Sequence, residues 1–143
     1  MKTINELNAW MKENCIKFDN YSIGGNSILE GYGIEIIAEG LYSWFYIERG
    51  NKNILDYFKS ENEVVNFAYN FISKDKYAKS HLIFQTECEN EKNVILNKLK
   101  INDFDFWFDK IPYLNSCGYI FRVFVVSCRY KELQKFDFDF KYL

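Results

Sequence analysis

Short runs of β-forming residues, separated by compact turns, are the feature that most constrains how this chain can fold. Three such runs cover residues 31–38, 42–49 and 54–58, with one turn at Glu39-Gly40 and another at residues 50–53. Turns this short join antiparallel neighbours, so the three runs are expected to form a β-meander. The middle run is apolar on both faces, with Trp44 on one and Phe45 on the other, which predicts a place inside a sheet.

Helical periodicity marks three further segments, at about residues 4–17, 61–73 and 89–100, in which apolar residues recur three or four positions apart. Thr3, Ser60 and Thr86 each stand at the start of one segment and have a glutamate three positions later. This spacing is typical of a capping box, in which the hydroxyl accepts a hydrogen bond from a free N–H of the first helical turn. A short helix is also expected over about residues 129–134.

Further strands are expected at residues 81–85, at 104–108 and at 119–126, and the tail from Phe136 to Tyr142 alternates apolar and polar residues. The resulting order is α-βββ-α-β-α-ββ-(α)-β. It predicts an α+β fold with a mostly antiparallel sheet of about five to seven strands and three or four helices packed on it. No linker or low-complexity segment interrupts the chain, so one domain over residues 1–143 is expected.

Composition argues against several broad classes of function. The chain has 18 basic and 20 acidic residues, a net charge of −2, and so lacks the basic excess of a general nucleic-acid-binding protein. Its longest uninterrupted apolar run, residues 123–126, is far too short to span a membrane. The first residues do not resemble a signal peptide. We therefore expect a cytoplasmic protein that binds neither nucleic acid nor membrane directly.

The glycines, the cysteines and the one histidine form no catalytic or metal-binding motif. Gly24-Gly25 fits neither a GxGxxG loop after a strand nor a loop that ends in Gly-Lys-Ser/Thr. His81 stands at the start of an expected strand, and we interpret it as structural or solvated. None of the four cysteines forms a CxxC pair, and one histidine cannot complete a usual zinc set. We expect no metal and no cofactor.

Acidic side chains are the most concentrated group with possible chemistry. Six of them gather in two short stretches: Glu87, Glu89, Glu91, Asp103, Asp105 and Asp109. The three aspartates occupy alternating positions of one expected strand, which would place them on one face. An ordinary solvated face fits this pattern, and so does a set of carboxylates for catalysis or metal binding. A third interpretation is an acidic surface that meets a basic protein partner.

Three stretches of the chain resemble small immunity proteins of bacterial polymorphic-toxin and contact-dependent growth inhibition systems. They are the aromatic run from Tyr42 to Gly50, the stretch from Asp75 to His81, and Arg122-Val123-Phe124-Val125. These motifs are aromatic and structural rather than catalytic, and the resemblance covers roughly residues 30 to 130. It implies a non-enzymatic protein that binds the C-terminal domain of a cognate toxin, plausibly a nuclease, in the cytosol and blocks its active site.

The resemblance carries over no binding residue, because such proteins share no fixed binding motif. The six acidic residues are our own candidates for contacts with the toxin, since an inhibitor of a nuclease would face a basic surface. Two other functions remain open. One is a general interaction or oligomerisation module built around the tail from Phe136 to Leu143, and the other is a small enzyme that uses the clustered carboxylates.

Overall fold

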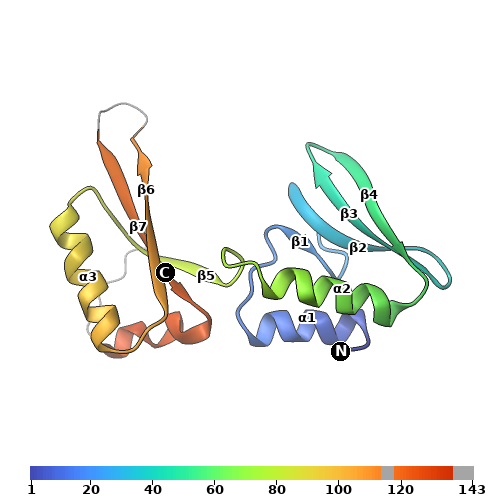
Figure 1. The fold of residues 1–143 in the computed structure, drawn as a ribbon, viewed down its shortest axis with the longest axis horizontal. Helices are drawn as coiled ribbons and strands as arrows, with labels where there is room; N and C mark the ends of the chain where they lie inside the picture. The colour runs from blue at the N-terminus through green and yellow to red at the C-terminus, as the bar shows by residue number, and fades with distance from the viewer. Residues whose placement is uncertain (114–117, 137–143) are drawn as a thin grey trace. The chain divides into compact units, whose positions relative to one another are not determined.

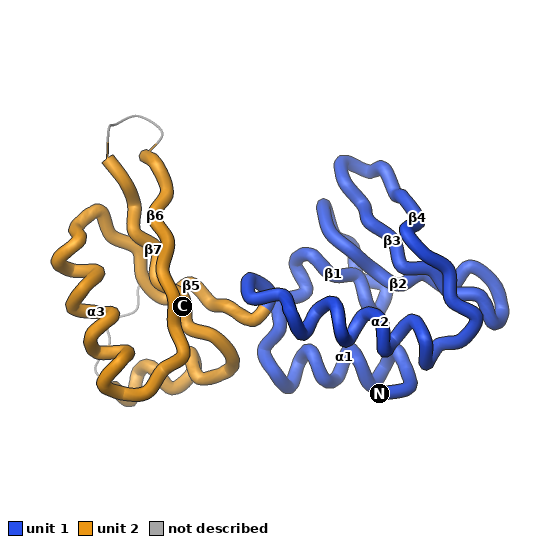
Figure 2. Tube along the Cα trace, in the orientation of Figure 1, with its two compact units in different colours: residues 1–78 blue, residues 79–143 orange. Residues whose placement is uncertain are grey.

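The computed structural model describes residues 1–113 and 118–136 of the 143-residue chain. The chain divides into two compact units, residues 1–78 and residues 79–143 (Figures 1 and 2). Each unit has its own sheet and its own cluster of buried apolar side chains.

The first unit is a four-stranded sheet with two helices packed against one face (Figure 1). Its strands are β1 (Tyr21–Ser22), β2 (Glu30–Ala38), β3 (Leu41–Glu48) and β4 (Asn51–Phe58), in the order β1-β2-β3-β4. Strands β2, β3 and β4 pair antiparallel, whereas the short β1 pairs parallel with β2. The predicted meander is therefore confirmed, with β3 inside the sheet.

The helices of the first unit are α1 (Ile4–Glu13) and α2 (Glu61–Ser73). Their apolar stripes bury Leu7 and Met11 of α1 and four residues of α2 against Trp44. Two predicted caps are confirmed. Thr3 Oγ1 accepts from the Glu6 N–H at 3.1 Å, and Ser60 Oγ accepts from the Glu63 N–H at 3.2 Å. Helix α1 is shorter than expected, because the backbone turns at Cys15, whose φ is 54°.

The second unit is a three-stranded antiparallel sheet in the order β5-β7-β6. Its elements are β5 (Ser80–Thr86), α3 (Glu89–Ile101), β6 (Phe106–Pro112), β7 (Tyr119–Val126) and the 3-10 helix η1 (Cys128–Phe136). The core lies between the sheet, α3 and η1, and its fully buried residues include Ile83, Leu99, Val123, Val125 and Leu133.

Two local predictions in the second unit are wrong. The residue that caps α3 is Cys88, without a side-chain cap bond, because Thr86 Oγ1 instead accepts from the Cys88 N–H and donates to Glu91. The strand expected from residue 104 begins at Phe106, because Asp103 has a φ of 57° and turns the chain after α3. The strand predicted in the tail from Phe136 to Tyr142 lies outside the described residues except for Phe136, which is the last residue of η1.

The expected α+β class with mostly antiparallel pairing is confirmed. Among residues 1–113 and 118–136 there are seven strands and four helices, counting the 3-10 helix. The strands are divided between two sheets instead of forming one. Within the same ranges, no helix combines the length and the apolar character needed to cross a membrane.

Candidate functional site

Three tyrosines lie side by side across the first three strands of the first unit. Tyr21 of β1 is the register partner of Tyr32 of β2, and Tyr32 is in turn the register partner of Tyr46 of β3. The ring centroids are 6.5 Å apart for Tyr21 and Tyr32 and 5.0 Å apart for Tyr32 and Tyr46. We call these three residues the tyrosine row.

The glycines on either side of Tyr32 allow β1 to lie close enough to form this row. A Cβ atom on Gly31 would come within 2.0 Å of the carbonyl oxygen of Asn20, and one on Gly33 within 2.6 Å of that of Ser22. Gly31 also has a φ of 141°, which side-chain-bearing residues rarely adopt. The Gly-Tyr-Gly sequence is therefore what the close pairing of β1 with β2 requires.

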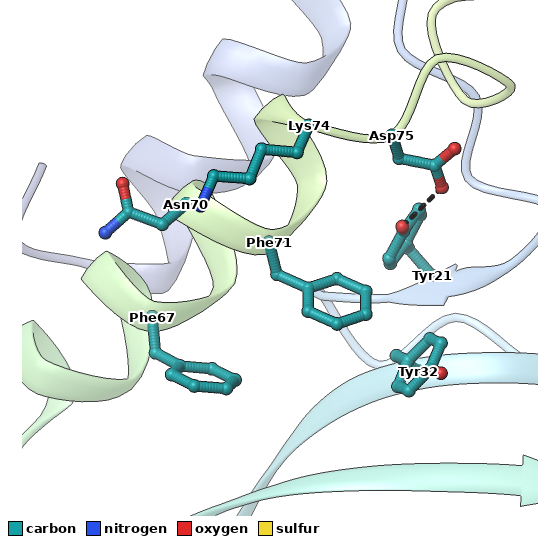
Figure 3. A pocket seen from close by; sticks show the side chains of 7 residues that line it. All are labelled: Tyr21, Tyr32, Phe67, Asn70, Phe71, Lys74 and Asp75. Atoms are coloured by element: carbon teal, nitrogen blue, oxygen red, sulfur yellow. Dashed lines mark hydrogen bonds between the residues drawn. The ribbon is translucent and has the colours of Figure 1, made fainter.

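A carboxylate holds the hydroxyl group at each end of the row. The Tyr21 hydroxyl donates to Asp75 Oδ2 at 2.6 Å (Figure 3), and the Tyr46 hydroxyl donates to Glu30 Oε1 at 2.8 Å. The other oxygen of Asp75 accepts the backbone N–H groups of Tyr77 and Ala78 at 3.0 and 3.2 Å. Asp75 is therefore held by three hydrogen bonds, whereas the exposed Glu30 is held by the Tyr46 hydroxyl.

These contacts make both end hydroxyls harder to ionise than an ordinary tyrosine. Burial is the main cause of the strongly raised pKa of Tyr21, and the hydrogen bond to Asp75 raises it further. The hydrogen bond to Glu30 is the main cause that raises the pKa of Tyr46 to about 12. Ionising either phenol would place a second negative charge next to a carboxylate.

Two neighbouring pockets open on the tyrosine row and share Tyr21, Tyr32 and Asp75. The larger has a volume of about 540 Å³ and is bounded by α2, which contributes Phe67 and Phe71 (Figure 3). The smaller, of about 390 Å³, is lined by Lys17, Asn20, Tyr21, Glu30, Gly31, Tyr32, Tyr46, Asp75, Tyr77 and Ala78. We call the second one the tyrosine–carboxylate pocket.

The larger pocket has an aromatic wall. In Figure 3, Phe71 extends from α2 toward Tyr32, and their ring centroids are 4.7 Å apart. Beneath them Trp44 stacks on Tyr32, with 5.7 Å between centroids and 11° between planes. Because these rings support one another from β2, β3 and α2, the wall is rigid and apolar.

A second exposed feature of the first unit is its edge strand. Among the described strands β4 pairs with β3 alone, and every residue of β4 except Phe58 is exposed. Ile54, Leu55 and Tyr57 are the large apolar residues exposed on it. We call these three residues the β4 surface.

The six predicted acidic residues do not form one surface. Glu87, Glu89 and Glu91 lie at the start of α3, whereas Asp103 and Asp105 follow its last residue. A helix of 13 residues is about 20 Å long, so two groups at its opposite ends cannot form a single cluster. Asp109 lies on β6, separate from both groups in sequence.

Several of these acids already have partners inside the second unit. Arg122 forms a two-pronged ion pair with Asp109, Lys92 Nζ lies 3.7 Å from Glu89 Oε1, and Glu91 accepts a hydrogen bond from Thr86. Glu87 accepts from the hydroxyl of Tyr113 and thereby raises the pKa of that tyrosine. The side chains of Asp103 and Asp105 are exposed and stay candidates for contact with a partner.

The structure places His81 in an aromatic contact of the second unit. The ring of His81 stacks on Tyr130 with 4.0 Å between centroids, a packing role for the one histidine of the chain. Within residues 1–113 and 118–136, no three His, Cys, Asp or Glu side chains converge so that they could hold a metal ion.

The tyrosine row could not be predicted from the sequence. The neighbours of Tyr46 cannot be assigned without knowing that a two-residue strand pairs with β2 at Tyr21. The Gly-Tyr-Gly sequence was the available signal, because glycines on alternate strand positions indicate a close backbone approach.

Comparisons with protein-family models, with curated proteins and with solved structures gave no match.

Proposed function

We propose that this chain is a non-enzymatic immunity protein, which binds a bacterial toxin domain in the cytosol and blocks its active site. The resemblance of the three sequence stretches motivates the toxin as partner. A protein of this kind acts by forming a stoichiometric complex, so what it needs is an exposed and rigid surface. The observation that carries the proposal is the β4 surface.

The β4 surface has the properties of a protein-binding site. Leu55 and Tyr57 are 54% and 57% exposed, and they lie on a strand whose outer edge has no partner among the described strands. Such an edge offers backbone N–H and C=O groups to a strand of another protein, while the side chains add apolar contact area. Tyrosine is also enriched among residues that dominate binding energy at interfaces.

The exposed aspartates of the second unit form a second candidate surface. Asp103 and Asp105 lie at the turn between α3 and β6, where a basic partner could approach them. Exposed charges of opposite sign mainly speed association, and add less to the lifetime of a complex. We therefore assign the main part of the binding energy to the β4 surface of the first unit, and treat these two residues of the second unit as a separate candidate surface.

The test is co-expression with the C-terminal domain of the protein encoded immediately upstream, scored by growth rescue and by co-purification. A one-to-one complex with rescue is the expected result. Leu55→Glu should weaken the complex at least about tenfold, because it places a charge in an apolar contact. Val94→Glu is the matched control, since Val94 on α3 is 55% exposed and should tolerate the change.

Comparing these variants shows whether the partner binds the β4 surface or the turn that carries Asp103 and Asp105. If Asp103→Lys with Asp105→Lys abolishes binding while Leu55→Glu has no effect, the interface is the acidic turn and not the β4 surface. A domain that is toxic alone, and is neither bound nor neutralised, would overturn the proposal with that domain as partner.

Oligomerisation is the second candidate function, and the β4 surface favours it as well. Two copies of the chain could pair through their β4 edges. Sedimentation of the protein alone decides this: a dimer that Leu55→Glu converts to a monomer would support an oligomerisation module.

A further inference from the structure

We propose that the tyrosine–carboxylate pocket binds an organic cation, namely an alkylammonium or guanidinium group. This inference is independent of the toxin and of the β4 surface. It rests on the tyrosine row, on the two carboxylates hydrogen-bonded to its ends, and on the cavity of about 390 Å³ that they line together.

The aromatic side chains of the pocket are suited to a cation. Tyr21, Tyr32 and Tyr46 form one continuous row of rings, and Tyr77 contributes a fourth tyrosine to the lining. The face of an aromatic ring carries negative charge density and attracts ammonium and guanidinium groups within about 6 Å of its centre. Proteins bind quaternary ammonium groups in cavities that several aromatic side chains line, and four tyrosines line this one.

The carboxylates distinguish a cation from a neutral apolar group of the same shape. Asp75 lies at one end of the row and Glu30 at the other, and each uses one oxygen for a tyrosine hydroxyl. The second oxygen of Glu30 accepts no hydrogen bond from the described part of the chain, and the Glu30 side chain is exposed. It is therefore the group best placed to meet an incoming charge.

The cationic groups near the pocket do not neutralise these carboxylates. Lys17 lines the same pocket, yet its Nζ forms no ion pair within 4.0 Å with Glu30 or Asp75 in the described structure. Lys74 lines the larger pocket, whose lining includes Asp75 but not Glu30. The charged groups that line the tyrosine–carboxylate pocket are thus two carboxylates and one ammonium, which favours a positively charged ligand.

The experiment compares two probes of equal shape by following backbone amide NMR signals of the full chain. Choline carries a trimethylammonium group, and 3,3-dimethylbutan-1-ol is its uncharged analogue. We expect choline to shift the signals of Gly31, Tyr32 and Tyr77 at millimolar concentration, and the alcohol to bind at least about tenfold more weakly. Equal binding of both probes, or no binding of any cationic probe, would overturn the proposal.

A third probe distinguishes the source of the cation. Nα-acetylarginine methylamide imitates an arginine side chain of a partner protein. If it binds more tightly than choline, the pocket accepts a side chain from another protein; if choline binds more tightly, the pocket accepts a free small cation. Either order supports the cation site, because both probes share the positive charge.

Three variants locate the binding at the named residues. Glu30→Gln should weaken the cationic probe about fivefold to tenfold, whereas Glu35→Gln, on the same strand and paired with Lys52 at 3.3 Å, should leave it unchanged. Tyr32→Leu removes a ring and should reduce binding by a similar factor. Because Tyr32→Leu could also unfold the unit, the exposed Glu30→Gln variant decides: unchanged affinity there would overturn the assignment.

Discussion

Arg122 and Asp109 lie directly opposite each other on β7 and β6, and the guanidinium group of Arg122 donates hydrogen bonds to both carboxylate oxygens of Asp109. The bond from Nε to Oδ1 is 2.8 Å long. This ion pair argues against Asp109 as a residue for contact with a partner. Its charge is already paired within the sheet, so its main role is to stabilise the second unit.

Replacing Asp109 by asparagine should therefore lower the stability of the second unit. The Arg122 and Asp109 side chains are only 31% and 29% exposed. The free energy of unfolding should therefore fall by about 1–2 kcal/mol, between the values typical of exposed and of buried ion pairs. Urea unfolding followed by the NMR signals of β6 and β7 measures it. Asp105→Asn is the control and should change stability by less than about 0.5 kcal/mol; equal effects of both variants would contradict the assignment.

The caps of α2 and α3 should respond differently to the same change. Ser60→Ala removes the hydroxyl that accepts from the Glu63 N–H at 3.2 Å, and should cost about 1 kcal/mol of stability in the first unit. Cys88→Ala removes a side chain that makes no cap bond, and should change stability by less than about 0.5 kcal/mol. Denaturant titration of both variants gives the comparison. A larger loss for Cys88→Ala would show that the thiol contributes in another way.

A methyl group added at Gly33 should be more costly than one added at an open turn. The new Cβ would lie 2.4 Å from Phe45 Cζ and 2.6 Å from the Ser22 carbonyl oxygen, and overpacking of this kind costs about 1–3 kcal/mol. Gly40→Ala is the control, because nothing lies within 4 Å of its Cβ; only its positive φ, 73°, adds a cost of about 1 kcal/mol. Thermal unfolding of the two variants tests this order.

The stabilising effect of Tyr46 should disappear at high pH. Its pKa rises from an ordinary 10.0 to about 12 in the folded chain because it donates to Glu30. The unfolded chain therefore loses this proton first, so the contribution is complete below pH 10 and is lost as the pH rises through about 12. Tyr46→Phe should be less stable than the natural chain at pH 8, and this difference should shrink between pH 10 and 12.

The control for this pH dependence is Tyr57→Phe. The Tyr57 hydroxyl makes no hydrogen bond to the described residues, and the ring is exposed, so this variant should match the natural chain at pH 8. Denaturation midpoints measured at several pH values give both comparisons. A Tyr46→Phe difference that stays constant up to pH 12 would mean that the hydroxyl does not contribute through its proton.

The features that the sequence predicted correctly depend on local chemistry. The meander follows from the short turns at Gly40 and Gly50, and α2 begins where Ser60 and Glu63 mark it. These signals act over a few residues, so they can be recognised without any knowledge of the fold.

The features that could not be predicted from the sequence depend on contacts between residues far apart in the chain. Strand β1 is only two residues long and forms because it pairs with β2. It is too short to be recognised as a run of β-forming residues. The tyrosine row depends on that pairing, and the bond from Tyr21 to Asp75 joins residues 54 positions apart. The division into two sheets likewise depends on which strands pair, which alternation along one strand does not specify.

The two glycines beside Tyr32 have a consequence for how this chain can diverge. Mutations at Gly31 or Gly33 would force β1 away from β2 and break the row, whereas the exposed β4 positions can vary freely without unfolding the sheet. Distant relatives should therefore retain Gly-Tyr-Gly followed by aromatic residues at positions 44 to 46, long after overall identity has been lost. That short pattern, rather than the sequence as a whole, is the fingerprint by which descendants of a common ancestor could be traced.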